Sequence, residues 1–329
     1  MATLAVIPLA QRVAILNNVT SLPRADRLHE KPTPYLGGVP IILVAAAASP
    51  FVGDWQLEGA VIIIGALLLG VVGLLDDIRN LRPAPRLIAE VCAALGAVAA
   101  GAHVQIFGGV IDVLLTVVWF VGVTNAFNIV DNMDGAAGGI ACATAVGLVI
   151  TAGLNGQVLV GGLAGVVAGS CLAFLVYNWH PARIFMGDAG TLPLGYLLAA
   201  IALKLRFPVA HFASVTAVVL FTAPALFDMT LVVISRFARH RPIYVGGTDH
   251  TSHRLLRLGL STRVVASLIT LTAAACAGLG VAVGRGVIPP WPVIIPLALV
   301  AAFGLVALLR LPAEASHPST AHDTPAHRD

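Results

Sequence analysis

The stretch from Asn125 to Gly135 carries side chains that could do chemistry at the end of a long apolar run. Two amides and two carboxylates recur there at every third position: Asn125, Asn128, Asp131 and Asp134. At a helix end this spacing places all four along one face. Carboxylates beside a membrane span are costly unless they bind a cation, pair or face water. A row of oxygen ligands suits a hard divalent ion such as Mg²⁺, with an ordinary polar loop and helix caps as the alternative.

Two adjacent acids, Asp76 and Asp77, follow another apolar run. Neighbouring carboxylates repel each other unless a cation or a proton lies between them. They stand at an expected helix C-terminus, where the helix dipole disfavours anions. We therefore expect a positive group nearby, either a metal ion or one of Arg79, Arg82 and Arg86; a helix end with solvated charges is the alternative.

Asp188 lies between Gly187 and Gly190, just before another apolar run. Glycines permit close backbone approach to a ligand, and the N-terminus of the following helix favours an anion such as phosphate. A plain turn explains the same residues.

Two histidines and several arginines occupy the longest polar loop, from Asp249 to Arg257. His250, His253 and Arg254 are residue types suited to phosphate contact. A basic loop attracted to anionic lipid is the competing interpretation. Lys31, beside a Thr-Pro-x-x-Gly-Gly turn, either holds a phosphate or simply precedes a span.

Two acids stand inside apolar runs, Asp228 and Glu90. An intramembrane acid is a functional candidate by default, and a hydrogen bond in helix packing is the alternative. The four cysteines lack CxxC spacing and are interpreted as small core residues.

The elements that position these residues are membrane helices. The chain has 329 residues, of which 58% are hydrophobic and 11% charged, and its mean hydropathy is +0.93; soluble domains average about 25% charged residues. Because backbone groups in a bilayer must be satisfied internally, and the apolar runs suit helices in length, we expect an all-α, polytopic bundle of about ten or eleven transmembrane helices. Residues 1–310 are predicted as one transmembrane domain and 311–329 as a disordered tail. The expected spans are 1–16, 36–52, 58–75, 86–101, 110–130, 138–154, 157–178, 191–207, 211–234, 262–284 and 291–310, the first being short for a full crossing.

The charges divide unequally between the two sides of the predicted bundle. Of the nineteen Lys and Arg residues, alternating spans place only Lys204, Arg206 and Arg285 on one side. The other side, with sixteen, is therefore predicted to be cytoplasmic. The unusual polar loops fall on that same side, which favours an active site at the cytoplasmic membrane surface. A transporter would instead place its key groups near the bilayer midplane.

Five motifs in this order resemble one family. They are Lys31-Pro-Thr-Pro-Tyr-Leu-Gly-Gly38, Leu75-Asp-Asp77, Asn125-Ala-Phe-Asn-Ile-Val-Asp-Asn-Met-Asp-Gly135, Phe185-Met-Gly-Asp-Ala-Gly190 and Asp249-His-Thr-Ser-His-Arg-Leu255. The chain resembles the polyprenyl-phosphate N-acetylhexosamine-1-phosphate transferases, the superfamily of MraY, WecA and TagO, and is more similar to the WecA/TagO branch. It departs from the family pattern at Asn132 and Met133, where Gly-Leu is common, and at Ser252, where His is common.

The resemblance implies a reaction and a set of roles. A UDP-N-acetylhexosamine, UDP-GlcNAc by preference, and a polyprenyl phosphate would give a polyprenyl-diphospho-sugar and UMP, with Mg²⁺ or alternatively Mn²⁺ as cofactor. The implied metal ligands are Asp188, Asp77 and Asn128. The implied catalytic residues are Asp76, Asp77, Asp131, Asp134, His250 and His253. The implied substrate-binding residues are Lys31, Arg86, Asn125, Asn128 and Arg254.

Physical chemistry agrees with this implied reaction. Both substrates carry negative phosphates, so a cation and basic side chains would be needed to bring them together. We expect direct attack of the lipid phosphate on the sugar-linked phosphorus, at headgroup level. The bilayer is a further expected partner, a homodimer is a further expectation, and no nucleic acid is expected.

Three other functions compete with this prediction. They are an MraY-type phospho-MurNAc-pentapeptide transferase, a transporter of a nucleotide- or lipid-linked sugar, and a CDP-alcohol phosphatidyltransferase, whose DGx2ARx8Gx3Dx3D signature is absent from the chain. A non-catalytic scaffold gives no reason for carboxylates in four separate loops.

Overall fold

The computed structural model describes residues 2–17, 19–21, 33–52, 57–244 and 246–311. Within these residues the chain forms twelve helices and one short antiparallel sheet, in which Thr20 pairs with Pro34 and Ser21 with Thr33. The helices are α1 (Ala2–Leu16), α2 (Val39–Val52), α3 (Leu57–Arg79), α4 (Pro83–Ala99), α5 (Gly109–Val130), α6 (Ala136–Leu154), α7 (Val158–Asn178), α8 (Asp188–Lys204), α9 (His211–Ala238), α10 (Thr251–Arg257), α11 (Thr262–Gly284) and α12 (Trp291–Arg310), and the strands are β1 (Thr20–Ser21) and β2 (Thr33–Pro34).

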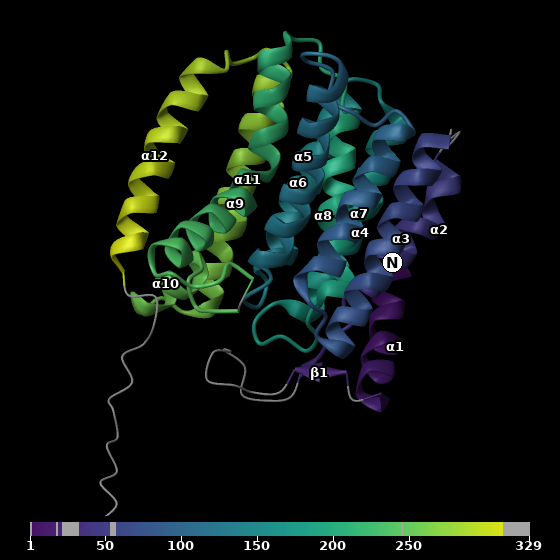
Figure 1. Cartoon of the computed structure of the whole chain (residues 1–329), viewed down its shortest axis with the longest axis vertical. Coiled ribbons are helices and arrows are strands. Elements are labelled where there is room, and N and C mark those ends of the chain that lie inside the picture. Colours follow the sequence, from purple (N-terminus) through teal and green to yellow (C-terminus); the bar gives the residue numbers. More distant parts are fainter. Residues whose placement is uncertain (1, 18, 22–32, 53–56, 245, 312–329) are drawn as a thin grey trace, which may run out of the picture.

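The long helices lie side by side as a bundle, with α10 and the small sheet at the same end (Figure 1). Seven helices of 19–28 residues are long and apolar enough to cross a membrane: α3, α5, α6, α7, α9, α11 and α12. Many large apolar side chains, such as Leu114 and Phe303, are exposed on these helices, as a lipid-facing surface requires. The protein is therefore a multi-pass membrane protein, and the predicted all-helical bundle is confirmed.

Helix α8 forms the centre of the bundle. Every residue from Ala189 to Ala202 is buried, and α3 and α5 pack against it. The sequence explains this, because this stretch contains no charged side chain and can be enclosed on all sides. Since α8 begins at Asp188, the most enclosed helix of the bundle fixes the position of that carboxylate.

Two glycines let neighbouring backbones touch the first turn of α8. A Cβ atom at Gly73 of α3 would lie 2.1 Å from the carbonyl oxygen of Asp188, and one at Gly38 would lie 2.1 Å from Cα of Gly190. Only glycine allows this contact. The last turn of α3 is thereby brought against the start of α8.

The predicted spans each coincide with a helix, with boundaries that differ by a few residues. The first helix, α1, has 15 residues and would extend for only about 22 Å, short of the roughly 30 Å hydrocarbon core. The prediction missed α10, which the sequence placed in a polar loop. Of the predicted tail, 311–329, only Leu311 lies within the described residues.

Candidate active site

The acids at the ends of α3 and α8 meet directly. Asp77 Oδ1 accepts a hydrogen bond from the backbone amide of Asp188, and Asp77 Oδ2 accepts one from Ala189, both at 3.0 Å. Asp77 therefore caps α8, and these bonds compensate for its unfavourable position at the C-terminus of α3. The sequence predicted a phosphate at the N-terminus of this helix, and the structure places the Asp77 carboxylate there.

Arg86 of α4 is the cation that these acids require. Its Nη1 lies 3.3 Å from Asp76 Oδ2 and 3.4 Å from Asp188 Oδ2, and its Nε lies 3.7 Å from Glu90 Oε1. The other oxygen of Asp76 accepts a hydrogen bond from the amide of Leu81 at 2.7 Å. One guanidinium therefore joins three acids from three helices, and the structure selects Arg86 from the three candidate arginines.

The two amides of α5 contact different neighbours. Asn128 Nδ2 donates to Asp188 Oδ1 at 2.6 Å and to Thr191 Oγ1 at 2.9 Å. Asn125 Nδ2 donates to Glu90 Oε2 on α4. Asn128 thus belongs to the acidic cluster, while Asn125 supports α4 beside it. Thr191 belongs to this cluster but is not among the predicted site residues, although its spacing of three residues from Asp188 on a helix was a usable signal.

The loop after α5 carries two further predicted acids. Asp131 lies near enough to Asp77 to act on it electrostatically. Asp134 Oδ2 lies 2.8 Å from His180 Nδ1 and accepts a hydrogen bond from the amide of Ala182 at 3.0 Å. Asp131 therefore joins the cluster, whereas the contacts of Asp134 tie its loop to the segment after α7.

The histidine motif lies on α10 and at its N-terminus. His250 Nδ1 lies 3.0 Å from Asp228 Oδ2, and the rings of His250 and His253 are 5.6 Å apart. Burial lowers the pKa of His253 to about 4, and the nearby His250 and Arg257 act in the same direction. His253 is therefore a neutral imidazole at pH 7.

Asn132 and Ser252, two of the three residues that depart from the family pattern, contact each other. Ser252 Oγ donates a hydrogen bond to Asn132 Oδ1, which joins α10 to the loop between α5 and α6. The histidine motif is thus connected to the loop that carries Asp131.

Arg254 does not lie in the site, which corrects its predicted role in substrate binding. Its side chain is fully buried. It donates to the carbonyl of Asp249 at 2.8 Å, to Ser235 Oγ at 2.8 Å, and to the carbonyls of Leu308 and Leu311 at the end of α12. A buried guanidinium with these partners holds α9, α10 and α12 together.

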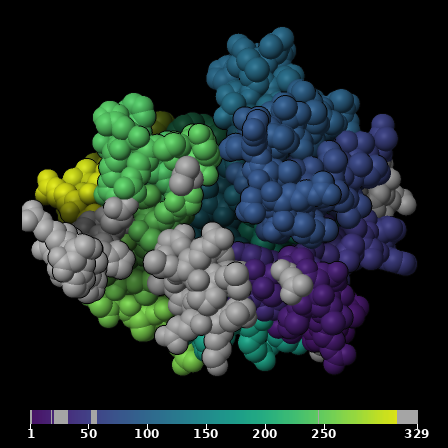
Figure 2. Space-filling model, turned by 60° about the horizontal axis from the view of Figure 1, so that its bottom comes forward, coloured from purple at the N-terminus to yellow at the C-terminus, as the bar shows by residue number. Residues whose placement is uncertain are grey.

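A cleft of about 840 Å³ is lined by residues of both the acidic cluster and the histidine motif. Figure 2 shows this end of the molecule, with a hollow between the blue segments of α3 and α4 and the green segments near α9 and α10. The polar and charged side chains that line the cleft include Tyr35, Arg86, Glu90, Asn125, Asn128, Asp131, Asn132, Asp134, Arg236, Tyr244, His250 and His253. Asp76, Asp77 and Asp188 lie directly behind Arg86 and Asn128. Lys31 falls outside the described residues.

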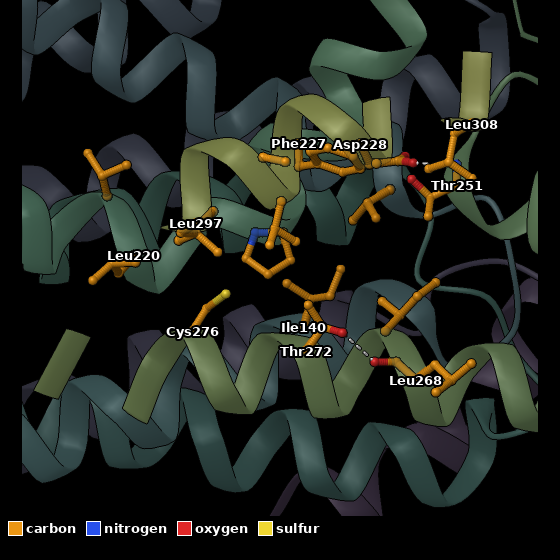
Figure 3. Close-up of a pocket in the computed structure, with 18 of the residues that line it drawn as sticks. Ile140, Leu220, Phe227, Asp228, Thr251, Leu268, Thr272, Cys276, Leu297 and Leu308 are labelled. Atoms are coloured by element: carbon orange, nitrogen blue, oxygen red, sulfur yellow. Dashed lines mark hydrogen bonds between the residues drawn. The ribbon is translucent and has the colours of Figure 1, made fainter. Parts of the chain in front are cut away.

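A second cavity, of about 620 Å³, lies between α6, α9, α11 and α12. Its walls are almost entirely apolar, and Asp228 and Thr251 lie together at one end (Figure 3). The charged cleft and this cavity are therefore separated by the segment that carries His250.

The acidic cluster fits a hard divalent cation in its chemistry. Asp76, Asp77, Asp131 and Asp188 supply carboxylate oxygens, and Arg86 pairs with Asp76 and Asp188. Oxygen ligands and excess negative charge are what Mg²⁺ prefers. The described residues contain no ready-made group of three acid, histidine or cysteine ligands. Arg86 and Asn128 contact the two oxygens of Asp188.

The fold and the cleft together define a membrane-embedded enzyme that handles charged substrates beside the bilayer. Residues 60–206 match the model of glycosyl transferase family 4. The chain is 32% identical over 283 residues to a Bacillus subtilis protein named "Probable undecaprenyl-phosphate N-acetylglucosaminyl 1-phosphate transferase", covering 82% of this chain and 79% of that protein.

Two further relatives agree at the level of the family. The decaprenyl-phosphate N-acetylglucosaminephosphotransferase of Mycobacterium leprae is 32% identical over 304 residues, covering 79% of this chain and 76% of that protein. The phospho-N-acetylmuramoyl-pentapeptide-transferase of Limosilactobacillus fermentum is 35% identical over 202 residues, covering 54% and 62% respectively. This chain belongs to glycosyl transferase family 4, and the predicted membership is confirmed.

Proposed function

We propose that this protein transfers N-acetylglucosamine 1-phosphate from UDP-N-acetylglucosamine to a polyprenyl phosphate and releases UMP, as the first step of a cell-envelope polysaccharide. The names of two relatives, which match over 82% and 79% of this chain, support transfer of N-acetylglucosamine 1-phosphate to a polyprenyl phosphate. The observation that carries the proposal is the convergence of Asp76 and Asp188 on Arg86, with Asp77 bonded to the backbone amide of Asp188, beside a cleft at one end of the membrane helices.

The residues of the cleft have separate tasks in this reaction. Arg86 faces the cleft and neutralises phosphate charge, which opposes the approach of two anionic substrates, and His250 also lines the cleft. Asp76 or Asp77 accepts the proton of the lipid phosphate. An oxygen of the lipid phosphate then attacks the sugar-linked phosphorus in line, and UMP leaves. The cleft holds both phosphates in reach of each other, which supplies proximity.

Asp188, Asp77 and Asn128 would hold the divalent ion, Mg²⁺ by preference and Mn²⁺ as the alternative. The carboxylate oxygens of Asp77 retain lone pairs beyond those used by the amides of α8. When bound, the ion supplies charge neutralisation at the diphosphate and at the leaving UMP.

The site faces the cytoplasm in this proposal, within a single domain of residues 1–310. The arginines of the site end, such as Arg86 and Arg236, belong to the larger group of basic residues, and Lys204 and Arg206 lie at the other end of α8. Basic residues concentrate on the cytoplasmic side of membrane proteins. A homodimer stays a prediction.

Release of UMP by the purified protein tests the function. We expect UMP from UDP-N-acetylglucosamine only when polyprenyl phosphate is present, and at least tenfold less from UDP-N-acetylmuramoyl-pentapeptide and from other UDP-sugars. Preference for the pentapeptide donor would assign the protein to the muramoyl branch instead. Uptake of a labelled UDP-sugar into proteoliposomes without UMP release would support a transporter and contradict the proposal.

Removal of divalent ions should abolish this activity reversibly. Because one arginine faces several carboxylates, the substrate phosphates would add to an uncompensated negative charge. We expect UMP release to fall by at least about 10²-fold in excess EDTA and to return with Mg²⁺ or Mn²⁺. Full turnover in EDTA, with metal content verified by mass spectrometry, would contradict a metal-dependent mechanism.

A further inference from the structure

Asp228 is a buried acid of α9 that the proposed chemistry does not yet use. Its side chain is 3% exposed. Asp228 Oδ1 accepts a hydrogen bond from the backbone amide of Thr251 at 2.7 Å, and Oδ2 lies 3.0 Å from His250 Nδ1. Figure 3 shows Asp228 and Thr251 side by side at the end of the apolar cavity. Each carboxylate oxygen thus has one partner in the histidine segment.

This contact determines which nitrogen of His250 carries the proton. An ionised carboxylate can only accept, so Nδ1 must be the donor, and Nε2 of the neutral ring is left with a lone pair. His250 lines the charged cleft, whereas Asp228 lines the apolar cavity on the other side. No hydrogen bond joins Nε2 to another described residue. The ring therefore stands between Asp228 and the cleft, with Nε2 available to a ligand.

The other titratable groups near His250 either pair with other residues or carry no negative charge. Asp249, the second nearby acid, pairs with Arg236 and Arg239. His253 is neutral at pH 7, and Arg257 is a cation bonded to Thr248 Oγ1. Asp228 is thus the acid that directly stabilises a proton on the His250 ring.

We propose that Asp228 is a positioning residue that fixes the Nδ1–H form of His250 and aims Nε2 at the substrate phosphates. This inference rests on the proposed function. Asp228 touches no substrate and acts through His250, in the way that a carboxylate orients an imidazole in other enzymes. Nε2 can then accept a proton from a protonated phosphate oxygen in the cleft and return it to the phosphate of the leaving UMP, while Nδ1–H stays bonded to the ionised Asp228.

The variant Asp228→Asn separates this role from simple helix capping. Its amide has one acceptor oxygen where the acid has two, so it cannot accept from both Thr251 and His250. If it serves the Thr251 amide, its NH₂ group faces Nδ1 and forces the opposite tautomer. We expect kcat for UMP release to fall by about 10²-fold or more, with KM for the UDP-sugar within about threefold.

A double-mutant cycle with His250→Gln decides whether Asp228 acts through the ring. In the His250→Gln background, adding Asp228→Asn should change kcat by less than about threefold, because the ring that Asp228 orients is gone. An undiminished cost of Asp228→Asn in that background would show that Asp228 is only structural. Asp228→Glu, which keeps the charge, should recover part of the activity.

The tautomer of His250 can be measured without turnover, so this test does not depend on the proposed function. In protein labelled with ¹⁵N-histidine, the ring of His250 should show protonated Nδ1 in the wild type at neutral pH and protonated Nε2 in Asp228→Asn. Identical ring shifts in the two proteins would overturn the proposal. Absence of UMP from every UDP-sugar would overturn the proposed function and leave the tautomer result standing.

Discussion

Replacement of Asp188 by Asn should abolish most of the transferase activity while the protein stays folded. Asp188 is the point at which α8, Arg86 of α4 and Asn128 of α5 meet. The substitution keeps the size of the side chain but removes a charge and one acceptor oxygen, and with them the strongest ligand for a cation. We expect UMP release to fall by about 10²–10³-fold, with an unchanged elution profile in detergent.

Glu58→Gln provides a matched control for this variant. Glu58 is also a membrane-proximal acid, and it pairs with Lys204 at 2.6 Å at the other end of α3 and α8. Because an ion pair far from the cleft contributes little to phosphate transfer, its loss should change UMP release by less than about twofold. Equal activity of Asp188→Asn and wild type would remove Asp188 from the mechanism.

Replacement of Asp77 by Asn should reduce both activity and stability. Both oxygens of Asp77 accept backbone hydrogen bonds from the first turn of α8, and an amide can accept only with one. One amide of α8 then lacks its acceptor, which costs about 1–3 kcal/mol. We expect a lower melting temperature together with an activity loss of about 10²-fold or more.

The position of Asp77 allows the two effects to be separated. A Cβ atom at Gly187 would lie 2.7 Å from Asp77 Oδ2, and Gly187 has φ of +72°, so Gly187→Ala should disturb the same cap without removing a charge. If Asp77 only caps α8, both variants should lose activity in proportion to their loss of stability. If Asp77 also takes part in the reaction, Asp77→Asn should lose much more activity than Gly187→Ala at equal stability.

Much of the fold could be predicted from the sequence, because long apolar runs in a bilayer have few alternatives to helices. Asp76, Asp77 and Asp188 could be placed in one site because their loops fall on the same side of alternating spans. The positive group beside Asp76 and Asp77 could only be predicted as a metal ion or one of three arginines, since the contact with Arg86 depends on how α4 packs against α3 and α8.

Other features depend on tertiary contacts that local patterns do not encode. Arg254 carries the charge expected of a phosphate ligand, yet it is buried against the end of α12, some fifty residues further along the chain. The helical form of α10 was hidden for the same reason, because a seven-residue segment with five polar or basic residues forms a helix there and contacts Asp228 and Asn132. Asp228 was predicted as a candidate because it lies within an apolar run, but its contact with His250 could not be predicted.

The most direct test of the account is the position of a divalent ion in the protein. A structure determined with Mn²⁺ and UMP, using the anomalous signal of manganese, would show where the ion binds. We predict one Mn²⁺ within about 2.0–2.5 Å of a carboxylate oxygen of Asp188 and of the UMP phosphate, with Arg86 displaced from Asp188. A manganese ion bound elsewhere, with Asp188 still held by Arg86 and Asn128 and UMP outside the cleft, would contradict the account.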